Sequence, residues 1–231
     1  MDVALLTVGD EVLAGETTNT NAAWLGRALT ARGANVRRTV VVPDEEAVIA
    51  DAVRELSERY DAVLVTGGLG PTPDDVTMAG VAAGLDREVV EHEGATRYVE
   101  AEGGYENAER DDALRRLPAG ARVLPNAAGV APGAAVETER ARVYVLPGVP
   151  SEMKEMFEAV ADEFAGTERL VETVHANEPE SALVDRIETA RERFDVSVGS
   201  YPGDGVRLRV SGTDGDAVHA AAQWLRERVE R

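Results

Sequence analysis

The sequence of 231 residues carries a formal net charge of −19, lacks cysteine and has hydrophobic residues at 44% of its positions. The absence of cysteine excludes disulfides, thiolate metal sites and cysteine nucleophiles, and the negative charge argues against a general binder of nucleic acids or anionic membranes, because phosphate groups would be repelled. Since no apolar stretch is long enough to span a bilayer and no basic region follows Met1, we expect a soluble cytoplasmic protein, large enough for one full domain and a small second one.

The first part of the chain alternates between strand and helix patterns. Short apolar runs predict buried strands, and segments with Ile49, Val53 and Leu56 on one face, or Leu25 and Leu29, predict helices. In chain order we predict strand 3–8, helix 20–32, strand 36–42, a helix from Pro43, strand 62–65 and a helix from Asp74 or Asp75 to about Ala83. This β-α-β-α-β-α order indicates a parallel sheet with right-handed crossovers.

The pattern is less regular from residue 91 onward. Residues 91–116 have helical periodicity interrupted at Gly103-Gly104, and the turn-rich segment 125–133 precedes predicted strands at 134–137 and 142–146. Pro150 is placed to start a helix that runs to about Phe164. A boundary near Gly166 divides the chain into a domain of residues 1–166 and a small α+β module of residues 167–231. In the module we predict strand 170–175, helix 180–193, strands 196–200 and 206–211, and helix 217–228.

One loop indicates where the function lies. Residues 66–75 read Thr-Gly-Gly-Leu-Gly-Pro-Thr-Pro-Asp-Asp and follow the predicted strand 62–65. Glycines, prolines and paired carboxylates suit a loop whose backbone approaches a ligand closely and whose acids face it. In an open α/β sheet such a loop lies at the carboxyl end of its strand, where ligands bind.

Three further loops, at 9–11, 126–133 and 147–154, combine glycine, proline and polar groups in the same way. Because the carboxyl ends of parallel strands meet at one edge of a sheet, these loops can converge on one pocket. Glycine amides would bind phosphate or a ring carbonyl, and carboxylates would hold a divalent cation or accept protons. The alternative is that the glycines serve only tight backbone geometry; we would prefer it for a single loop, whereas four loops together favour a ligand site.

Standard fingerprints are absent. The chain has no Gly-Lys-Ser/Thr ending of a P-loop and no Gly-x-Ser-x-Gly elbow, and Gly68-Leu69-Gly70-Pro71 lacks the third glycine of the dinucleotide motif. The three histidines are far apart and have no metal-ligand spacing. A classical nucleotide fold motif and a hydrolase triad are therefore not expected.

Several motifs nevertheless occur in a recognisable order. They are Gly9-Asp10-Glu11-Val12-Leu13, Asn19-Thr20-Asn21, Pro43-Asp44-Glu45, Thr66-Gly67-Gly68-Leu69-Gly70-Pro71-Thr72 with Asp74-Asp75, Ala131-Pro132-Gly133 and Leu146-Pro147-Gly148-Val149-Pro150-Ser151-Glu152-Met153-Lys154. Over residues 1–165 they resemble the molybdopterin-binding domain superfamily, most closely its competence/damage-inducible protein A (CinA) branch, and the tail resembles the KH-like module that follows this domain there. The resemblance implies a three-layer α/β/α domain with a mostly parallel sheet.

The resemblance also implies chemistry. In relatives that adenylylate molybdopterin, two aspartates act with Mg-ATP, and by motif they match Asp75 and Asp44. CinA relatives are associated instead with metal-dependent cleavage of ADP-ribose to AMP and ribose phosphate. The sequence has no counterpart of the nicotinamide-mononucleotide deamidase domain of longer CinA proteins, so we do not expect that activity. Val130 stands where the family usually has threonine.

Local sequence gives some of these residues a second interpretation. Asp75 can coordinate a metal and also cap the helix that follows, and Asp44 after Pro43 reads as an ordinary N-cap that only the resemblance makes catalytic. Asp10 and Glu11 follow a buried strand, where adjacent acids are costly without a cation or a donor. Lys154 is the only lysine, in an acidic, arginine-using composition that resembles proteins of high-salt environments; it either contacts phosphate or lies on a solvated face.

We therefore predict a CinA-like protein that cleaves the pyrophosphate of ADP-ribose-like compounds with a divalent cation such as Mg²⁺. Adenylyl transfer to molybdopterin is the second candidate, and a non-catalytic pterin- or nucleotide-binding module the third. Catalysis is assigned to Asp75 and Asp44, and the metal to Asp10, Glu11 and Asp75. Ligand contacts are expected from Gly9, Thr66, Gly67, Gly68, Gly70, Pro71, Thr72, Asn126, Gly129, Pro132, Gly133, Pro147, Gly148, Ser151 and Lys154. We expect a homo-oligomer with no membrane or nucleic-acid partner, since residues 199–205 supply no Gly-x-x-Gly clamp.

Overall fold

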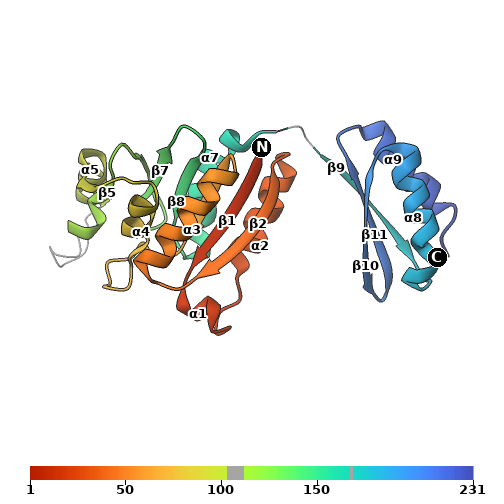
Figure 1. The fold of residues 1–231 in the computed structure, drawn as a ribbon, viewed down its shortest axis with the longest axis horizontal. Helices are drawn as coiled ribbons and strands as arrows, with labels where there is room; N and C mark the ends of the chain where they lie inside the picture. The colour runs from red at the N-terminus through yellow and green to blue at the C-terminus, as the bar shows by residue number, and fades with distance from the viewer. Residues whose placement is uncertain (103–111, 167–168, 231) are drawn as a thin grey trace. The chain divides into compact units, whose positions relative to one another are not determined.

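The computed structural model describes residues 1–102, 112–166 and 169–230. Its contacts divide the chain into two compact units, one ending at Gly166 and one running from Thr167 to Arg231 (Figure 1). The predicted interruption at Gly103-Gly104 lies outside the described residues. Within those residues, no helix has the length and apolar character that crossing a bilayer requires.

The first unit is an α/β domain. Its elements are β1 Asp2–Val8, α1 Asp10–Leu13, α2 Thr20–Ala31, β2 Asn35–Val42, α3 Glu46–Arg59, β3 Ala62–Thr66, α4 Thr77–Gly84, β4 Val89–Glu91, α5 Glu93–Glu102, β5 Arg116–Pro118, β6 Arg122–Leu124, β7 Gly133–Glu137, β8 Arg142–Leu146, α7 Pro150–Val160 and the 3-10 helix η1 Ala161–Phe164. Six strands form one sheet in the order β2-β1-β3-β8-β7-β6. Of these, β2, β1, β3 and β8 are parallel, and β7 is antiparallel to both neighbours, so the predicted mostly parallel sheet is confirmed.

Helices cover both faces of this sheet (Figure 1). Alternate side chains of the central strands point to opposite sides: Leu6 and Val65 pack with Ile49 of α3, whereas Leu5 and Leu64 belong to the core on the other face. That second core contains Leu25 and Leu29 of α2 and Met153 and Phe157 of α7. Burial on both faces explains why the strands read as continuous apolar runs, and the three layers follow from it.

The structure departs from the predicted elements in three places. A short helix, α1, replaces the predicted loop after β1, and α4 begins at Thr77 with Val76 as its N-cap, so neither Asp74 nor Asp75 opens it. The segment predicted to be helical from residue 91 contains α5, but it is bordered by the paired strands β4 and β5. Each of these strands has three residues, too few to show an alternation in sequence.

The second unit has the predicted β-α-β-β-α order. It consists of β9 Leu170–Ala176, α8 Glu180–Phe194, β10 Ser197–Gly203, β11 Gly205–Gly212 and α9 Gly215–Arg226. The strands form an antiparallel sheet in the order β10-β11-β9, and α8 and α9 lie on one face of it (Figure 1). Leu183 and Leu225 of the helices pack there against Val174, Leu208 and Val210 of the strands.

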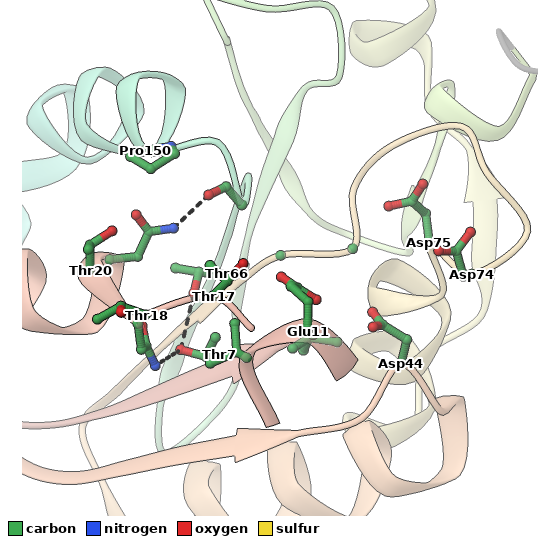
Figure 2. A pocket seen from close by; sticks show the side chains of 18 residues that line it. Thr7, Glu11, Thr17, Thr18, Thr20, Asp44, Thr66, Asp74, Asp75 and Pro150 are labelled. Carbon is green, nitrogen blue, oxygen red and sulfur yellow. Dashed lines mark hydrogen bonds between the residues drawn. The ribbon is translucent and has the colours of Figure 1, made fainter. Parts of the chain in front are cut away.

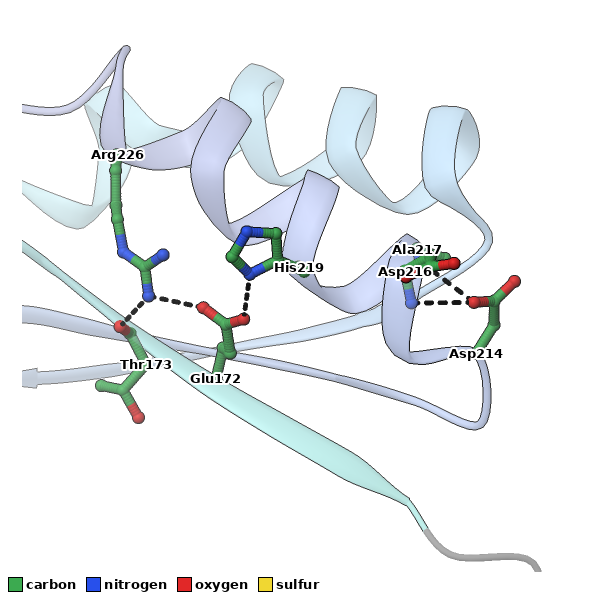
Figure 3. A network of polar contacts seen from close by, with 7 residues as sticks. All are labelled: Glu172, Thr173, Asp214, Asp216, Ala217, His219 and Arg226. Atoms are coloured by element: carbon green, nitrogen blue, oxygen red, sulfur yellow. Dashed lines mark hydrogen bonds and ion pairs between the residues drawn. The ribbon is translucent and has the colours of Figure 1, made fainter.

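A polar network joins α9 to β9. The Glu172 carboxylate on β9 lies 2.9 Å from His219 Nδ1 and accepts a hydrogen bond from Arg226 Nη2 at 2.6 Å, and both partners belong to α9 (Figure 3). The hydrogen bond from His219, with a smaller contribution from Arg226, lowers the pKa of Glu172. Asp214 caps the same helix by accepting from the amides of Asp216 and Ala217.

Substituting Glu172→Gln should lower the free energy of unfolding of this unit by about 1 kcal/mol at pH 7, because the side chain is partly exposed and screened. A carboxylate with a lowered folded-state pKa stabilises above its unfolded value of about 4.3 and loses that contribution as the pH falls through the folded value. The difference between the proteins should therefore disappear in acid. Urea unfolding followed by Trp224 fluorescence, in a Trp24→Phe background, measures it.

The matched control is Glu227→Gln. Glu227 pairs with the adjacent Arg228 and its side chain is 58% exposed, so a change of no more than about 0.3 kcal/mol is expected. Equal effects of the two substitutions would show that the network does not stabilise α9.

Candidate functional site

A cavity of about 280 Å³ lies at the carboxyl edge of the parallel strands. Thr7 of β1 and Thr66 of β3 stand opposite each other in the register, and Thr66 is opposite Leu146 of β8, so these three strands end at one level. Gly9, Gly67, Gly68 and Gly148 from the following loops line the cavity, as do Thr20 and Pro150, the first residues of α2 and α7 (Figure 2). Of the four loops that were predicted to converge on one pocket, those at 9–11, 66–75 and 147–154 therefore do so.

The glycines let these backbones meet. Gly67 has a φ of +103°, its amide donates to the Leu146 carbonyl at 3.2 Å, and a Cβ on it would lie 2.2 Å from the Val8 carbonyl oxygen. A Cβ on Gly148 would lie 3.3 Å from the Gly67 Cα. Only a residue without a side chain fits at Gly67, since both its conformation and its surroundings exclude a Cβ.

One wall of the cavity is neutral and polar. It carries hydroxyl and amide side chains, namely Thr7, Thr17, Thr18, Asn19, Thr20, Asn21 and Thr66 (Figure 2). Asn19 Nδ2 donates to Thr7 Oγ1 at 3.0 Å, and Asn21 Nδ2 donates to the Gly148 carbonyl at 2.7 Å. The Asn21 side chain is buried, and its Oδ1 has no hydrogen-bond partner in the described structure. This wall therefore contains a buried acceptor that no described residue satisfies.

The opposite wall is acidic. Glu11, Asp44, Asp74 and Asp75 line it, with Glu11 drawn between the threonines and the three aspartates in Figure 2. Asp44 Oδ2 accepts from the Asp10 amide at 2.9 Å. Partial burial raises the pKa of Asp44, and the neighbouring carboxylates of Asp10, Glu11 and Asp74 raise it further. The acidic wall therefore carries like charges that a cation would relieve.

Hard carboxylate oxygens suit Mg²⁺ and similar cations, but the described residues contain no group of three or more acids or histidines placed to hold a metal alone. Magnesium commonly binds through one or two carboxylates together with phosphate oxygens of a substrate. The acidic wall fits that kind of shared site.

Comparison with known proteins identifies the fold family. Residues 4–166 match the family described as a probable molybdopterin binding domain. The chain belongs to this family. A protein of Archaeoglobus fulgidus is 37% identical over 229 residues, with 98% of this chain and 97% of that protein aligned.

CinA is represented among the similar proteins. A CinA-like protein of Citrifermentans bemidjiense is 37% identical over 246 residues, covering 99% of this chain and 58% of that protein. The solved structure of CinA from Thermoplasma acidophilum is similar with a TM-score of 0.68 and 36% identity, over 72% of this chain and 100% of that one. Residues 168–231 match the middle domain of FAD synthase, which corrects the KH-like interpretation of the tail. A β-α-β-β-α order is too short a pattern to distinguish the two modules.

The molybdopterin-binding domain places only part of the predicted site residues around its cavity. Those that line it are Gly9, Glu11, Asp44, Thr66, Gly67, Gly68, Asp75 and Gly148. Gly70 and Pro132 line a smaller neighbouring cavity of about 50 Å³, together with Gly68 and Asp75. The remainder line neither cavity: Asp10, Pro71, Thr72, Asn126, Gly129, Gly133, Pro147, Ser151 and Lys154.

Several of the remaining residues have structural contacts. Asn126 is buried and its Nδ2 donates to the Ala131 carbonyl at 3.0 Å and to Glu152 Oε2 at 2.7 Å. A Cβ on Gly129 would lie 2.4 Å from Glu152 Oε2, and one on Gly133 would lie 2.4 Å from the Val145 carbonyl oxygen. In this loop Gly129 and Gly133 make room for close packing, and neither has a positive φ.

The contacts of three charged residues, Asp75, Asp44 and Lys154, differ from those that the sequence suggested. Asp75 Oδ2 accepts from the amide and the hydroxyl of Thr72, at 2.9 and 2.6 Å, and so orders its own loop. Asp44 is not an N-cap, because α3 begins at Glu46 after Glu45, and its carboxylate faces the cavity instead. The Lys154 ammonium lies 5.9 Å from the centroid of the Trp24 ring, between α7 and α2.

Apart from Thr66, the residues of the neutral wall were not assigned from the sequence as site residues, and neither was Asp74. Asn19, Thr20 and Asn21 stood among the motifs of the resemblance, but without a role. Thr7 and Thr66 are buried at the ends of adjacent strands, where an apolar residue would be expected. Two buried threonines at matching strand ends are the signal that could have found this wall.

Proposed function

We propose that the molybdopterin-binding domain binds a phosphorylated nucleotide and, with a divalent cation, cleaves the pyrophosphate of ADP-ribose-like compounds. The observation that carries the proposal is one cavity with a neutral hydrogen-bonding wall facing an acidic wall. A nucleoside diphosphate derivative has matching parts, since its ribose and base are neutral donors and acceptors and its pyrophosphate binds cations.

The neutral wall receives the uncharged part of the ligand. The buried Asn21 Oδ1 accepts from a hydroxyl or ring N–H, and the hydrogen bond from Asn21 to the Gly148 carbonyl holds the amide in that orientation. The amino end of α7 also flanks the cavity, at Pro150 outside the neutral wall, so its helix dipole favours phosphate groups there.

The acidic wall supports hydrolysis. Water adds to one phosphorus while the bridging P–O bond of the pyrophosphate breaks, which yields AMP and ribose phosphate. Asp44 accepts the proton of the water, because its carboxylate faces the cavity beside the acids that would hold the cation. Glu11 and Asp75 would hold a divalent cation together with the pyrophosphate, and the cation would neutralise the charge of the phosphate groups.

Adenylyl transfer to molybdopterin is the second candidate. The buried acceptor at Asn21 favours it, because a pterin ring carries N–H donors. A non-catalytic binding module is the third, and the same experiment distinguishes it.

Purified protein is incubated with ADP-ribose, or with ATP and molybdopterin, with and without Mg²⁺ or Co²⁺, and AMP and pyrophosphate release are followed by chromatography. We expect metal-dependent AMP release from ADP-ribose, reduced about 100-fold by Asp75→Asn. Asp51→Asn is the control, because its side chain is 83% exposed and pairs with Arg54 on the surface of α3. Pyrophosphate release from ATP that depends on molybdopterin would favour adenylyl transfer, and binding without turnover in every mixture would exclude both reactions.

A further inference from the structure

The second unit leaves one face of its sheet without helices. In the register of β9, β11 and β10, the outward rows are His175–Arg207–Tyr201, Thr173–Arg209–Gly199 and Val171–Ser211–Ser197. The residues between them in sequence, such as Val174, Leu208 and Val210, pack against α8 and α9 on the other side. We call these nine outward positions the open face.

The open face has a charge opposite to that of the chain. None of its nine positions is acidic, although the chain carries a net charge of −19. Arg207 and Arg209 form no ion pair with any described residue, and Arg207 instead lies 5.4 Å from the centroid of the Tyr201 ring. They are two residues apart on one strand, about 7 Å, and so present two guanidinium groups in a row.

Tyr201 lies along the sheet surface. A Cβ on Gly199 would be 3.0 Å from Tyr201 Cε2 and 3.1 Å from its hydroxyl, so the ring covers the glycine. The tyrosine remains 44% exposed. The Arg207 guanidinium lies over this ring, and an exposed aromatic ring with an arginine over it forms a surface on which a further planar group can stack.

A groove of about 340 Å³ adjoins the open face along the edge strand β9. Thr173 and His175 belong to both the groove and the open face, and Arg226 lines the groove on the α9 side. Because Arg226 pairs with Glu172, the unpaired arginines of this region are those of the open face itself.

We propose that the open face binds single-stranded nucleic acid, with a base stacked on Tyr201 and phosphates at Arg207 and Arg209. Exposed aromatic and arginine side chains on an antiparallel sheet are the combination that recognises unstacked bases and their backbone. The two arginines attract a polyanion to the open face. At physiological salt the negative charge of the remaining surface is screened beyond about 8 Å, so it does not cancel this local attraction. A duplex hides its base faces, so it is disfavoured.

The test is fluorescence anisotropy of the full chain with a labelled ten-nucleotide single strand, at salt concentrations from about 50 mM to about 150 mM. Arg207→Glu with Arg209→Glu should weaken binding at least tenfold, and Tyr201→Ala about fivefold or more. Two neutralised phosphates predict a slope of log K against log salt of about −1.4. Arg193→Glu is the matched control, since it makes the same charge change per residue on α8, where Arg193 contacts Phe194. Circular dichroism melting confirms that each variant is folded.

Four results would overturn the proposal. They are no saturable binding at low salt, an equal loss with Arg193→Glu, equal affinity for a duplex, and displacement of the strand by excess ADP-ribose, which would place it in the cavity of the first unit. A dimer that Arg209→Glu converts to a monomer, without loss of oligonucleotide binding, would assign the face to a second copy of the chain instead.

Discussion

Asp44→Asn is expected to reduce turnover about 100-fold while making the folded protein more stable. The loss of activity follows because asparagine cannot accept the proton of the attacking water. The gain in stability follows because the Asp44 carboxylate is partly buried and lies among Asp10, Glu11 and Asp74, whereas an asparagine oxygen still accepts from the Asp10 amide without a charge. We expect about 1 kcal/mol, or a rise in Tm of about 2–4 °C.

The stability effect depends on pH in a direction opposite to that of an ordinary ion-paired aspartate. Because the folded-state pKa of Asp44 is raised above the unfolded value of about 3.9, the wild type loses stability as the pH rises through the interval between the two. The advantage of Asp44→Asn should thus be complete at pH 7 and shrink toward pH 4, and it should shrink with added salt at pH 7.

Thermal unfolding at both pH values, paired with the AMP-release assay, measures the two effects. Asp51→Asn, which removes the same charge from the exposed surface of α3, should change neither by much. If Asp44→Asn retained full turnover, Asp44 would not take part in the catalytic step. A Tm below that of the wild type would show that neighbouring groups compensate the charge of the Asp44 carboxylate.

Gly67→Ala is expected to destabilise the first unit by about 3 kcal/mol or more. The new Cβ would lie 2.2 Å from the Val8 carbonyl oxygen, and the φ of +103° is one that alanine rarely adopts. Since β1 and β3 are central strands, the clash cannot be relieved without separating strand ends that form the cavity. Ligand binding should therefore be lost even where the protein remains folded.

Chemical denaturation and ligand titration test this, with Gly26→Ala as the control. Gly26 lies inside α2, and a Cβ there would have no neighbour within 4 Å. The control should stabilise by about 0.5–1 kcal/mol, as expected for glycine to alanine within a helix. Similar behaviour of the two variants would show that the strand ends are more compliant than the structure indicates.

The fold of the first unit was predictable because its signals are local. Strands β1 and β3 are buried on both faces and read as apolar runs, and Ile49, Val53 and Leu56 recur with the helical period. The short helix α1 and the strands β4 and β5 could not be predicted. Elements of three or four residues are too short to show a sequence pattern of their own, and contacts with neighbouring elements stabilise them.

The site was predictable only at its strand ends. Gly67 and Gly68 follow a strand and must face the ligand edge, whereas Gly129 and Gly133 look alike in sequence but approach Glu152 and Val145 instead. Glycine marks a close approach, and sequence does not say whether the approaching group is a ligand or the protein itself.

By itself, the sequence determined the alternation of elements, the parallel sheet and the edge at which glycines and acids collect, because each follows from residues close together in the chain. The tertiary structure alone decided that Thr7 and Asn21 line a neutral wall, that Asp44 accepts from the Asp10 amide and does not cap α3, and that Lys154 packs near Trp24. The tertiary structure also decided which side of β11 carries no helix of the second unit. These outcomes depend on residues far apart in the chain, such as Asn21 and Gly148, which are 127 positions apart and meet only because whole helices pack on the sheet.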